Sequence, residues 1–295
     1  MPAAWIPITI FAAAAQTVRN AAQRHLTAEL GTLGATLVRF LYGVPFAALW
    51  LAAVLSFHSG ISLAPPNAPF AAWLLVGAVG QIGAMALLLR VMEERNFTLG
   101  VAYSKTEVLQ VAIFGWLFLG DPVSPGSAAA VVLGTAGVFL LSGGWRAGWS
   151  ARTAAYGVAC GSLFAISAVG YRGAELALPM GPFVVTAAFT LLLAQAVQTL
   201  LLCGWLLVRD ARVVVRVLRA WRVSLLAGFM GAAASAGWFS AFAIEPVAHV
   251  RTLGLIELLF AYLVSRRLFS DQLRPIEVGA MVLLGISLAM VTIGG

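Results

Sequence analysis

Long apolar segments separated by short polar connections run through the whole 295-residue chain. A transmembrane helix needs about 20 mostly apolar residues, and a window of that length finds ten candidate spans. They cover residues 3–22, 33–56, 70–91, 99–119, 125–141, 154–173, 182–207, 223–243, 247–264 and 275–293. No stretch resembles a soluble domain. The pattern therefore predicts an all-α integral membrane protein with ten transmembrane helices.

An internal repeat relates the two halves of the chain. The fourth span ends at Asp121, and its counterpart 150 positions later ends at Asp271; a glutamate stands fourteen residues before each aspartate, at Glu107 and Glu257. Chance similarity between two apolar stretches is the alternative explanation.

The same offset places Pro125 on Pro275, and each proline begins the fifth span of its half. Proline suits the first helical turn because the N–H that it lacks has no intrahelical acceptor there. Five spans per repeat give the halves, residues 1–144 and 145–295, opposite orientations in the membrane. Such inverted repeats place a binding site near the middle of the bilayer.

Arginines are concentrated in the connections after the odd-numbered spans. These connections hold Arg24, Arg90, Arg95, Arg146, Arg152, Arg209, Arg212, Arg216, Arg219, Arg222, Arg266, Arg267 and Arg274, thirteen in all, whereas Arg172 stands alone after the even-numbered spans. Positively charged loops stay in the cytoplasm, so both termini are predicted outside the inner membrane of a bacterial-type cell. Residues 208–222 form a basic amphipathic segment, predicted to lie on an anionic leaflet.

Composition excludes several classes of protein. The chain is 61% hydrophobic and only 10% charged, whereas soluble domains are about 25% charged. The net charge of +7 resides in the gaps between apolar runs, which argues against nucleic-acid binding. Cys160 and Cys203 lack the spacing of a disulfide framework or a metal site. With no phosphate-binding loop or hydrolase motif, we expect neither an enzyme nor a cofactor.

Lys105, Glu107 and Glu257 are the leading candidates for substrate binding. An ionised side chain at membrane depth costs about 2.5–3.5 kcal/mol on insertion scales, so such groups face a bundle interior or a water-filled cavity. The glutamates can bind a cationic group or carry protons, or they can be structural. Lys105, the only lysine, stands two positions from Glu107 and should point away from it in a regular helix. Its expected partner is a substrate carboxylate or another helix.

Further polar residues inside spans are weaker candidates. Tyr103 and Gln110 share a helical face with Glu107 at i, i+4 and i+7. Arg39 in the second span is expected to be mainly structural, and Gln81 and Trp238 can equally serve helix packing. A polar group of the first span comprises Gln16, Arg19 and Asn20, of which Arg19 is expected at the membrane interface. His249 and Arg251 at the start of the ninth span are also read first as interface residues.

These features together resemble the ten-helix EamA-type branch of the drug/metabolite transporter superfamily. The matching positions are the glutamates of the fourth and ninth spans and the acid that ends each span, together with Arg39. The family's proline after the glutamate is replaced by Val108 and Leu258. The resemblance implies a basket of helices around a central cavity, alternating access, peripheral fifth and tenth helices, and export of small metabolites. It also implies cytoplasmic termini, contrary to the arginine count.

The resulting hypothesis is a secondary transporter, an exporter by resemblance, for a small molecule, most plausibly an amino acid or amine. Carboxyls and Lys105 together suit a zwitterion, with proton coupling through a glutamate as an option. A cationic drug or guanidinium antiporter is the alternative within this class. The alternative outside the transporter class is a non-transporting membrane protein, either a lipid scramblase or a structural subunit. In such a protein buried partners neutralise Lys105 and Glu107, and no solvent path leads to them. We expect a monomer or homodimer in the lipid bilayer.

Overall fold

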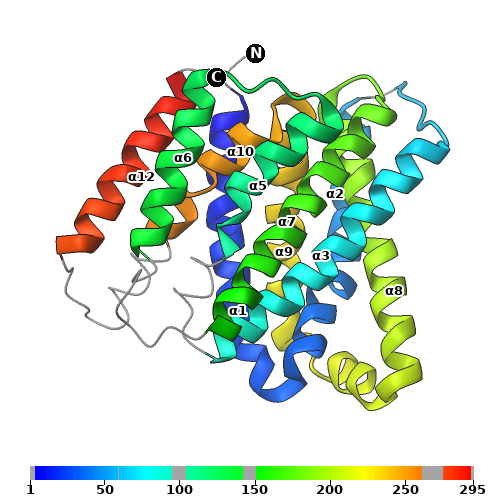
Figure 1. Cartoon of the computed structure of the whole chain (residues 1–295). Coiled ribbons are helices and arrows are strands. Elements are labelled where there is room, and N and C mark those ends of the chain that lie inside the picture. Colours follow the sequence, from blue (N-terminus) through cyan, green and yellow to red (C-terminus); the bar gives the residue numbers. More distant parts are fainter. Residues whose placement is uncertain (1–3, 59, 95–103, 142–150, 261–274, 294–295) are drawn as a thin grey trace.

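A computed structural model describes residues 4–58, 60–94, 104–141, 151–260 and 275–293, and every regular element in these ranges is a helix (Figure 1). The elements are α1 (Trp5–Leu41), α2 (Gly43–Phe57), α3 (Ala68–Glu94), α5 (Glu107–Phe114), the π-helix η1 (Gly115–Leu119), α6 (Pro125–Leu141), α7 (Ala151–Ala177), α8 (Phe183–Arg219), α9 (Trp221–Ile244), α10 (Val247–Leu253) and α12 (Pro275–Ile293). The all-α prediction is confirmed, and α6 and α12 begin at the predicted prolines.

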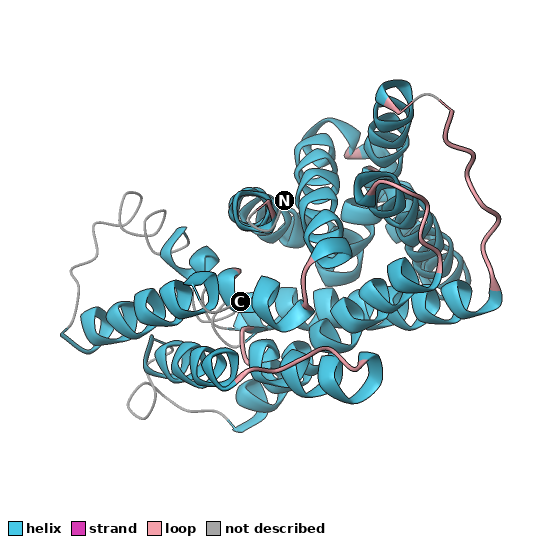
Figure 2. Ribbon diagram, turned by 90° about the horizontal axis from the view of Figure 1, so that it is seen from above, coloured by secondary structure: helices cyan, strands magenta, loops and turns pink. Residues whose placement is uncertain are grey.

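The helical bundle has two opposite ends, the terminal face and the arginine-rich face. The terminal face is the end where α1 begins and α12 ends, at the top of Figure 1. The arginine-rich face is the opposite end, where α8 meets α9. Figure 2 looks down on the terminal face and shows helices joined by loops, among them the extended segment 60–67 between α2 and α3.

The first two predicted spans are longer than expected, because most of the connection between them is helical. The chain turns at Gly31, whose backbone has φ 71° and ψ 169°. Positive φ is accessible to glycine because it lacks a Cβ. Helical residues continue on both sides, so the arms 5–30 and 32–57 are two helical segments joined at Gly31. Four long apolar segments of the structure can cross a membrane: Trp5–Phe57, Ala68–Glu93, Phe183–Arg219 and Trp221–Ile244.

The basic amphipathic segment lies on the arginine-rich face. Helix α8 is interrupted at Asp210, which has extended backbone angles, and then continues to Arg219. Val213 and Val217 are buried, and both lie against the second arm of α1, while Arg216 is exposed. One apolar side of the segment is therefore buried, although Val215 and Leu218 are exposed; its position on a leaflet stays a prediction.

Small residues let the main helix pairs approach closely. Helices α3 and α7, α1 and α9, and α6 and α12 form the most extensive contacts. A Cβ atom built on Gly170 would lie 2.7 Å from the backbone nitrogen of Gly77, and one on Gly237 would lie 2.7 Å from the Cβ of Ala12. Backbone therefore packs on backbone at the α3–α7 contact, and Gly237 lets α9 approach α1 equally closely. The pair α6–α12 lies at one edge of the bundle (Figure 1).

Helical structure is interrupted just before each of the two glutamates. A turn at Lys105–Thr106 precedes α5, and a turn at Gly254–Leu255 separates α10 from the helical residues 256–260. The backbone N–H of Glu257 donates to the carbonyl of Gly254 at 3.1 Å, a tighter connection than the α-helical one. Interrupted helices of this kind carry the binding residues in many transporters.

Candidate functional site

Four charged side chains form a buried cluster at the two helix interruptions. Lys105 Nζ lies 2.5 Å from Glu257 Oε2 and 3.8 Å from Glu107 Oε1. Arg251 Nη1 lies 3.4 Å from the same oxygen of Glu107. All four residues are at most 5% exposed. The structure therefore brings the two predicted glutamates and Lys105 together, with a second cation that the sequence did not assign to the site.

The pairing of Lys105 with Glu107 corrects the prediction that these side chains point apart. Residues two positions apart in a regular helix lie about 200° around its axis, on nearly opposite sides. Lys105 is part of the turn that precedes α5, so this helical geometry does not apply. The principal partner of Lys105 is Glu257 in the other half of the chain.

Amide side chains of α1 also bind Glu257. Gln16 Nε2 donates to Glu257 Oε2 at 2.7 Å, and Asn20 Nδ2 donates to Oε1 at 2.9 Å. The indole N–H of Trp238 donates to Gln16 Oε1 at 2.9 Å. The guanidinium of Arg251 lies 4.6 Å from the centre of the Trp238 ring, a cation–π contact. Trp238 is thus part of the site.

Three residues expected at the membrane interface are buried instead. Arg19 is fully buried, Arg251 is 5% exposed and His249 is 7% exposed. For His249 and Arg251 the expectation was wrong because α10 is a short helix packed inside the bundle, with all seven of its residues buried. For Arg19 it was wrong because the side chain lies against Gly231, where α1 packs on α9. The signal for Arg251 was present in the sequence: it stands six positions before Glu257 in the same apolar run.

The space inside the cluster is very small in the described part of the chain. It measures about 10 Å³ and is bordered by Ser104, Leu88 and Phe164 besides the charged and amide groups. A space of that size holds about one water molecule at most. Buried partners thus neutralise Lys105 and Glu107, as the non-transporting alternative required, and this conformation has no room for a substrate.

Arg39 is buried outside the cluster. Its guanidinium donates to Ser235 Oγ at 3.2 Å and contacts Met85 Sδ at 3.3 Å. The side chains of Arg39 and Arg19 both lie against Gly231. A Cβ atom built on this glycine would lie 3.1 Å from Arg39 Cγ and 3.6 Å from Arg19 Cδ. Neither arginine forms an ion pair with a carboxylate among the described residues.

Two further candidates, Gln81 and Gln110, lie outside the central cluster. Gln81 Oε1 accepts hydrogen bonds from Tyr171 and Gln198 at 2.9 and 2.7 Å, in a separate polar group between α3, α7 and α8. Gln110 is only partly buried and does not border the central space. Tyr103 lies outside the described residues, as does Asp271.

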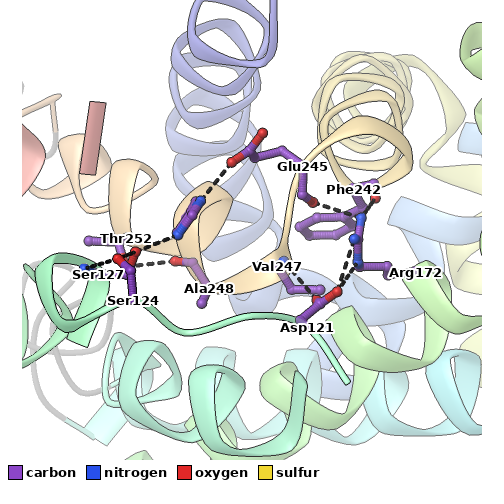
Figure 3. Close-up of polar contacts among 10 residues, drawn as sticks. Asp121, Ser124, Ser127, Arg172, Phe242, Glu245, Val247, Ala248 and Thr252 are labelled. Carbon is purple, nitrogen blue, oxygen red and sulfur yellow. Dashed lines mark hydrogen bonds and ion pairs between the residues drawn. The ribbon is translucent and has the colours of Figure 1, made fainter. Parts of the chain in front are cut away.

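A second network joins the two halves at the terminal face (Figure 3). Arg172, on α7, donates from Nε and Nη2 to Asp121 Oδ1 at 3.1 and 2.9 Å. Its Nη1 donates to the carbonyl oxygens of Phe242 and Glu245, at the end of α9. Arg172, at the end of the predicted sixth span, was counted with the connection that follows; in the structure it lies inside α7, which continues past it to Ala177.

His249 extends this network to α6. Its Nδ1 lies 2.6 Å from Glu245 Oε1, and its Nε2 lies 2.7 Å from the hydroxyl oxygen of Ser127. The backbone N–H of Val247 donates to Asp121 Oδ2 at 3.4 Å. These contacts fasten the start of α10 to the segment between η1 and α6.

A larger hollow of about 750 Å³ lies between α1, α2, α8 and α9. Its lining is apolar, with Phe11, Trp50 and Phe229 partly exposed and Ser240 as its polar residue. An apolar hollow with exposed aromatic rings suits a lipid-facing surface better than a site for a charged metabolite.

A membrane-embedded helical bundle with charged residues sealed at interrupted helices is typical of multi-pass membrane transporters. Comparison with known families agrees: residues 3–143 match the EamA-like transporter family of the drug/metabolite transporter superfamily. The chain thus carries a domain of this family, whose members are transporters and not enzymes. It is therefore a multi-pass membrane transporter with a small-molecule substrate.

One solved structure has the same fold. It is titled "Crystal structure of protein", and it matches with a TM-score of 0.73 over 99% of this chain and 97% of that chain, at 17% sequence identity. No curated protein matches the sequence.

Proposed function

We propose that the chain is a secondary transporter of a small amino acid, working by alternating access between two inverted five-helix repeats, residues 1–144 and 145–295. Support comes from the two helix interruptions, each next to one glutamate, and from the ion pair that joins Lys105 of one half to Glu257 of the other. Helix α1 begins and α12 ends on the same face, as ten spans require (Figure 1).

The observation that carries the substrate class is an excess of buried positive charge in and beside the central site. Lys105 and Arg251 pair there with Glu107 and Glu257, whereas Arg19 and Arg39 are buried beside the cluster with no carboxylate counter-ion among the described residues. An uncompensated buried charge costs several kcal/mol. A substrate with a carboxylate would remove this cost.

Unused hydrogen-bond donors point to the same conclusion. Arg19 Nη1, Arg39 Nε and Arg251 Nε are buried without an acceptor in the described ranges of the chain. Guanidinium groups bind carboxylates through paired N–H donors. We assign the carboxylate of the substrate to these arginines and its ammonium to Glu107 or Glu257, which are held by Lys105 and Arg251 while the site is closed.

This assignment favours an amino acid over an amine or a cationic drug, because neither of the latter supplies a negative charge for Arg19 and Arg39. The scramblase or structural alternative explains the neutralised pairs but not the two unpaired arginines. We also propose that the arginine-rich face is cytoplasmic, that both termini are outside, and that transport is export. Proton coupling through the central glutamates remains part of the proposal, as does a monomer or homodimer.

The test is counterflow in proteoliposomes with three groups of compounds: zwitterionic amino acids, the amines that lack only their carboxylate, and quaternary cations. Variants are Arg39→Met, Lys105→Met and Glu257→Gln, with the exposed Arg90→Met as control. We expect uptake of an amino acid but not of its amine, lost in the three site variants and unchanged in the control. Uptake of amines or quaternary cations by the wild-type protein, at a rate unchanged in Arg39→Met, would contradict the proposed substrate class.

A further inference from the structure

Glu175 is a buried carboxyl for which the central site has no use. It lies near the end of α7 and is 3% exposed. Neither of its carboxyl oxygens has a hydrogen-bond partner among the residues that the structure describes. The other buried carboxylates of the described residues, Glu107, Glu257 and Asp121, all have ion-pair partners. Glu175 is the exception among them.

The basic group nearest in sequence is already occupied. Arg172 stands one helical turn before Glu175, but its guanidinium binds Asp121 and the carbonyl groups at the end of α9. In Figure 3 the side chain of Arg172 points to Asp121 and to these carbonyls. Arg172 thus binds only one of the two carboxyl groups, Asp121, and leaves Glu175 without an ion-pair partner among the described residues.

The elements packed against α7 supply no other counter-charge. Helices α3 and α8 have no charged residue in their halves near the terminal face. Glu245, at the end of α9, and His249, on α10, are paired with each other, and Arg251 is paired with Glu107. On α7 itself, Tyr171 is engaged with Gln81 and Gln198. An isolated carboxylate is strongly disfavoured in such a place.

We propose that Glu175 is a proton-binding site that couples the opening of the terminal face to proton release. In the closed conformation described above, Glu175 carries a proton, and Arg172 binds Asp121. When the terminal face opens, the Arg172–Asp121 ion pair breaks. The O–H bond of Glu175 then breaks, its proton passes to water at the terminal face, and Arg172 pairs with the resulting carboxylate.

The geometry allows this exchange. Arg172 and Glu175 are three positions apart on one helix, a spacing at which oppositely charged side chains meet. Asp121 belongs to the other half of the chain, so the same arginine either ties the halves together or serves its own helix. The inference rests on the proposed alternating access, since it assigns the terminal face an open and a closed state.

The first experiment detects the proton directly, without a transport assay. Infrared spectra of the purified protein in detergent at neutral pH are expected to contain the C=O band of a protonated carboxyl, shifted by ¹³C-labelled glutamate. Glu175→Gln should lose this band, and Glu107→Gln should keep it. Absence of a glutamate band from the wild-type spectrum would overturn the proposal without any variant, as would its persistence in Glu175→Gln.

The second experiment tests the coupling. Spin labels at Val123→Cys and Leu176→Cys, both exposed, report the separation of the two halves at the terminal face after Cys160 and Cys203 are replaced by serine. Raising the pH should lengthen the distance in the otherwise wild-type protein and leave it short in Glu175→Gln. A distance that responds to pH equally in both proteins would overturn the coupling.

The two proposals fail in different ways. A protein that transports none of the tested compounds but keeps the Glu175 band refutes the amino-acid function and supports the proton site. A protein that carries an amino acid but lacks the band refutes the proton site alone.

Discussion

Replacing Lys105 by methionine removes the cation that joins the two halves of the central site while keeping most of the side-chain volume. The ammonium lies 2.5 Å from Glu257 and 3.8 Å from Glu107, at 3% exposure. Removing one partner of a buried ion pair costs about 3–5 kcal/mol, because the remaining charge stays buried without compensation. Glu257 keeps its hydrogen bonds from Gln16 and Asn20, so we expect a cost near the lower end of this range.

The double variant distinguishes pairing from simple loss of packing. Glu257→Gln alone should cost about 3 kcal/mol, because Lys105 then loses its nearest anion. Lys105→Met combined with Glu257→Gln leaves neither charge unpaired, so the double variant should cost less than about 3 kcal/mol, whereas independent effects would add to about 6 kcal/mol.

The measurement is thermal unfolding of the purified protein in detergent, followed by tryptophan fluorescence. At about 2–4 °C per kcal/mol, each single variant should lower the Tm by roughly 6–12 °C. Arg90→Met removes a largely exposed cation 3.7 Å from Glu93 and should change the stability by about 0.5 kcal/mol or less. Additive losses in the double variant would refute the ion-pair reasoning.

Three further predictions concern packing, the second polar group and orientation. Gly170→Ala should destabilise by about 1–3 kcal/mol in thermal unfolding, because the new Cβ would meet the backbone of α3, whereas Gly204→Ala, with open space around it, should be neutral or stabilising. Tyr171→Phe should cost about 1–3 kcal/mol in the same assay, because buried amide groups lose a hydrogen-bond partner. In intact cells, an impermeant maleimide should label Phe57→Cys at the terminal face and not Arg216→Cys at the arginine-rich face; the reverse labelling would contradict the proposed orientation.

The sequence by itself determined the helical class, the approximate spans and the two glutamates. This was possible because the bilayer requires long apolar helices and makes every charged residue inside them conspicuous. The prolines at the starts of α6 and α12 and the amphipathic end of α8 were equally readable, since each depends on residues close together in the chain.

Only the tertiary structure decided which charges meet. The pairing of Lys105 with Glu107 depends on a helix interruption, and the membership of Arg251 in the site depends on the burial of α10. Arg172 joins the two halves at the terminal face through contacts with segments that are distant in the chain. Because these contacts occupy Arg172, Glu175 is left without a partner among the described residues. Hydrophobic periodicity places a residue on a helix and at a depth in the membrane, but the neighbours of a buried charge are set by how the helices pack.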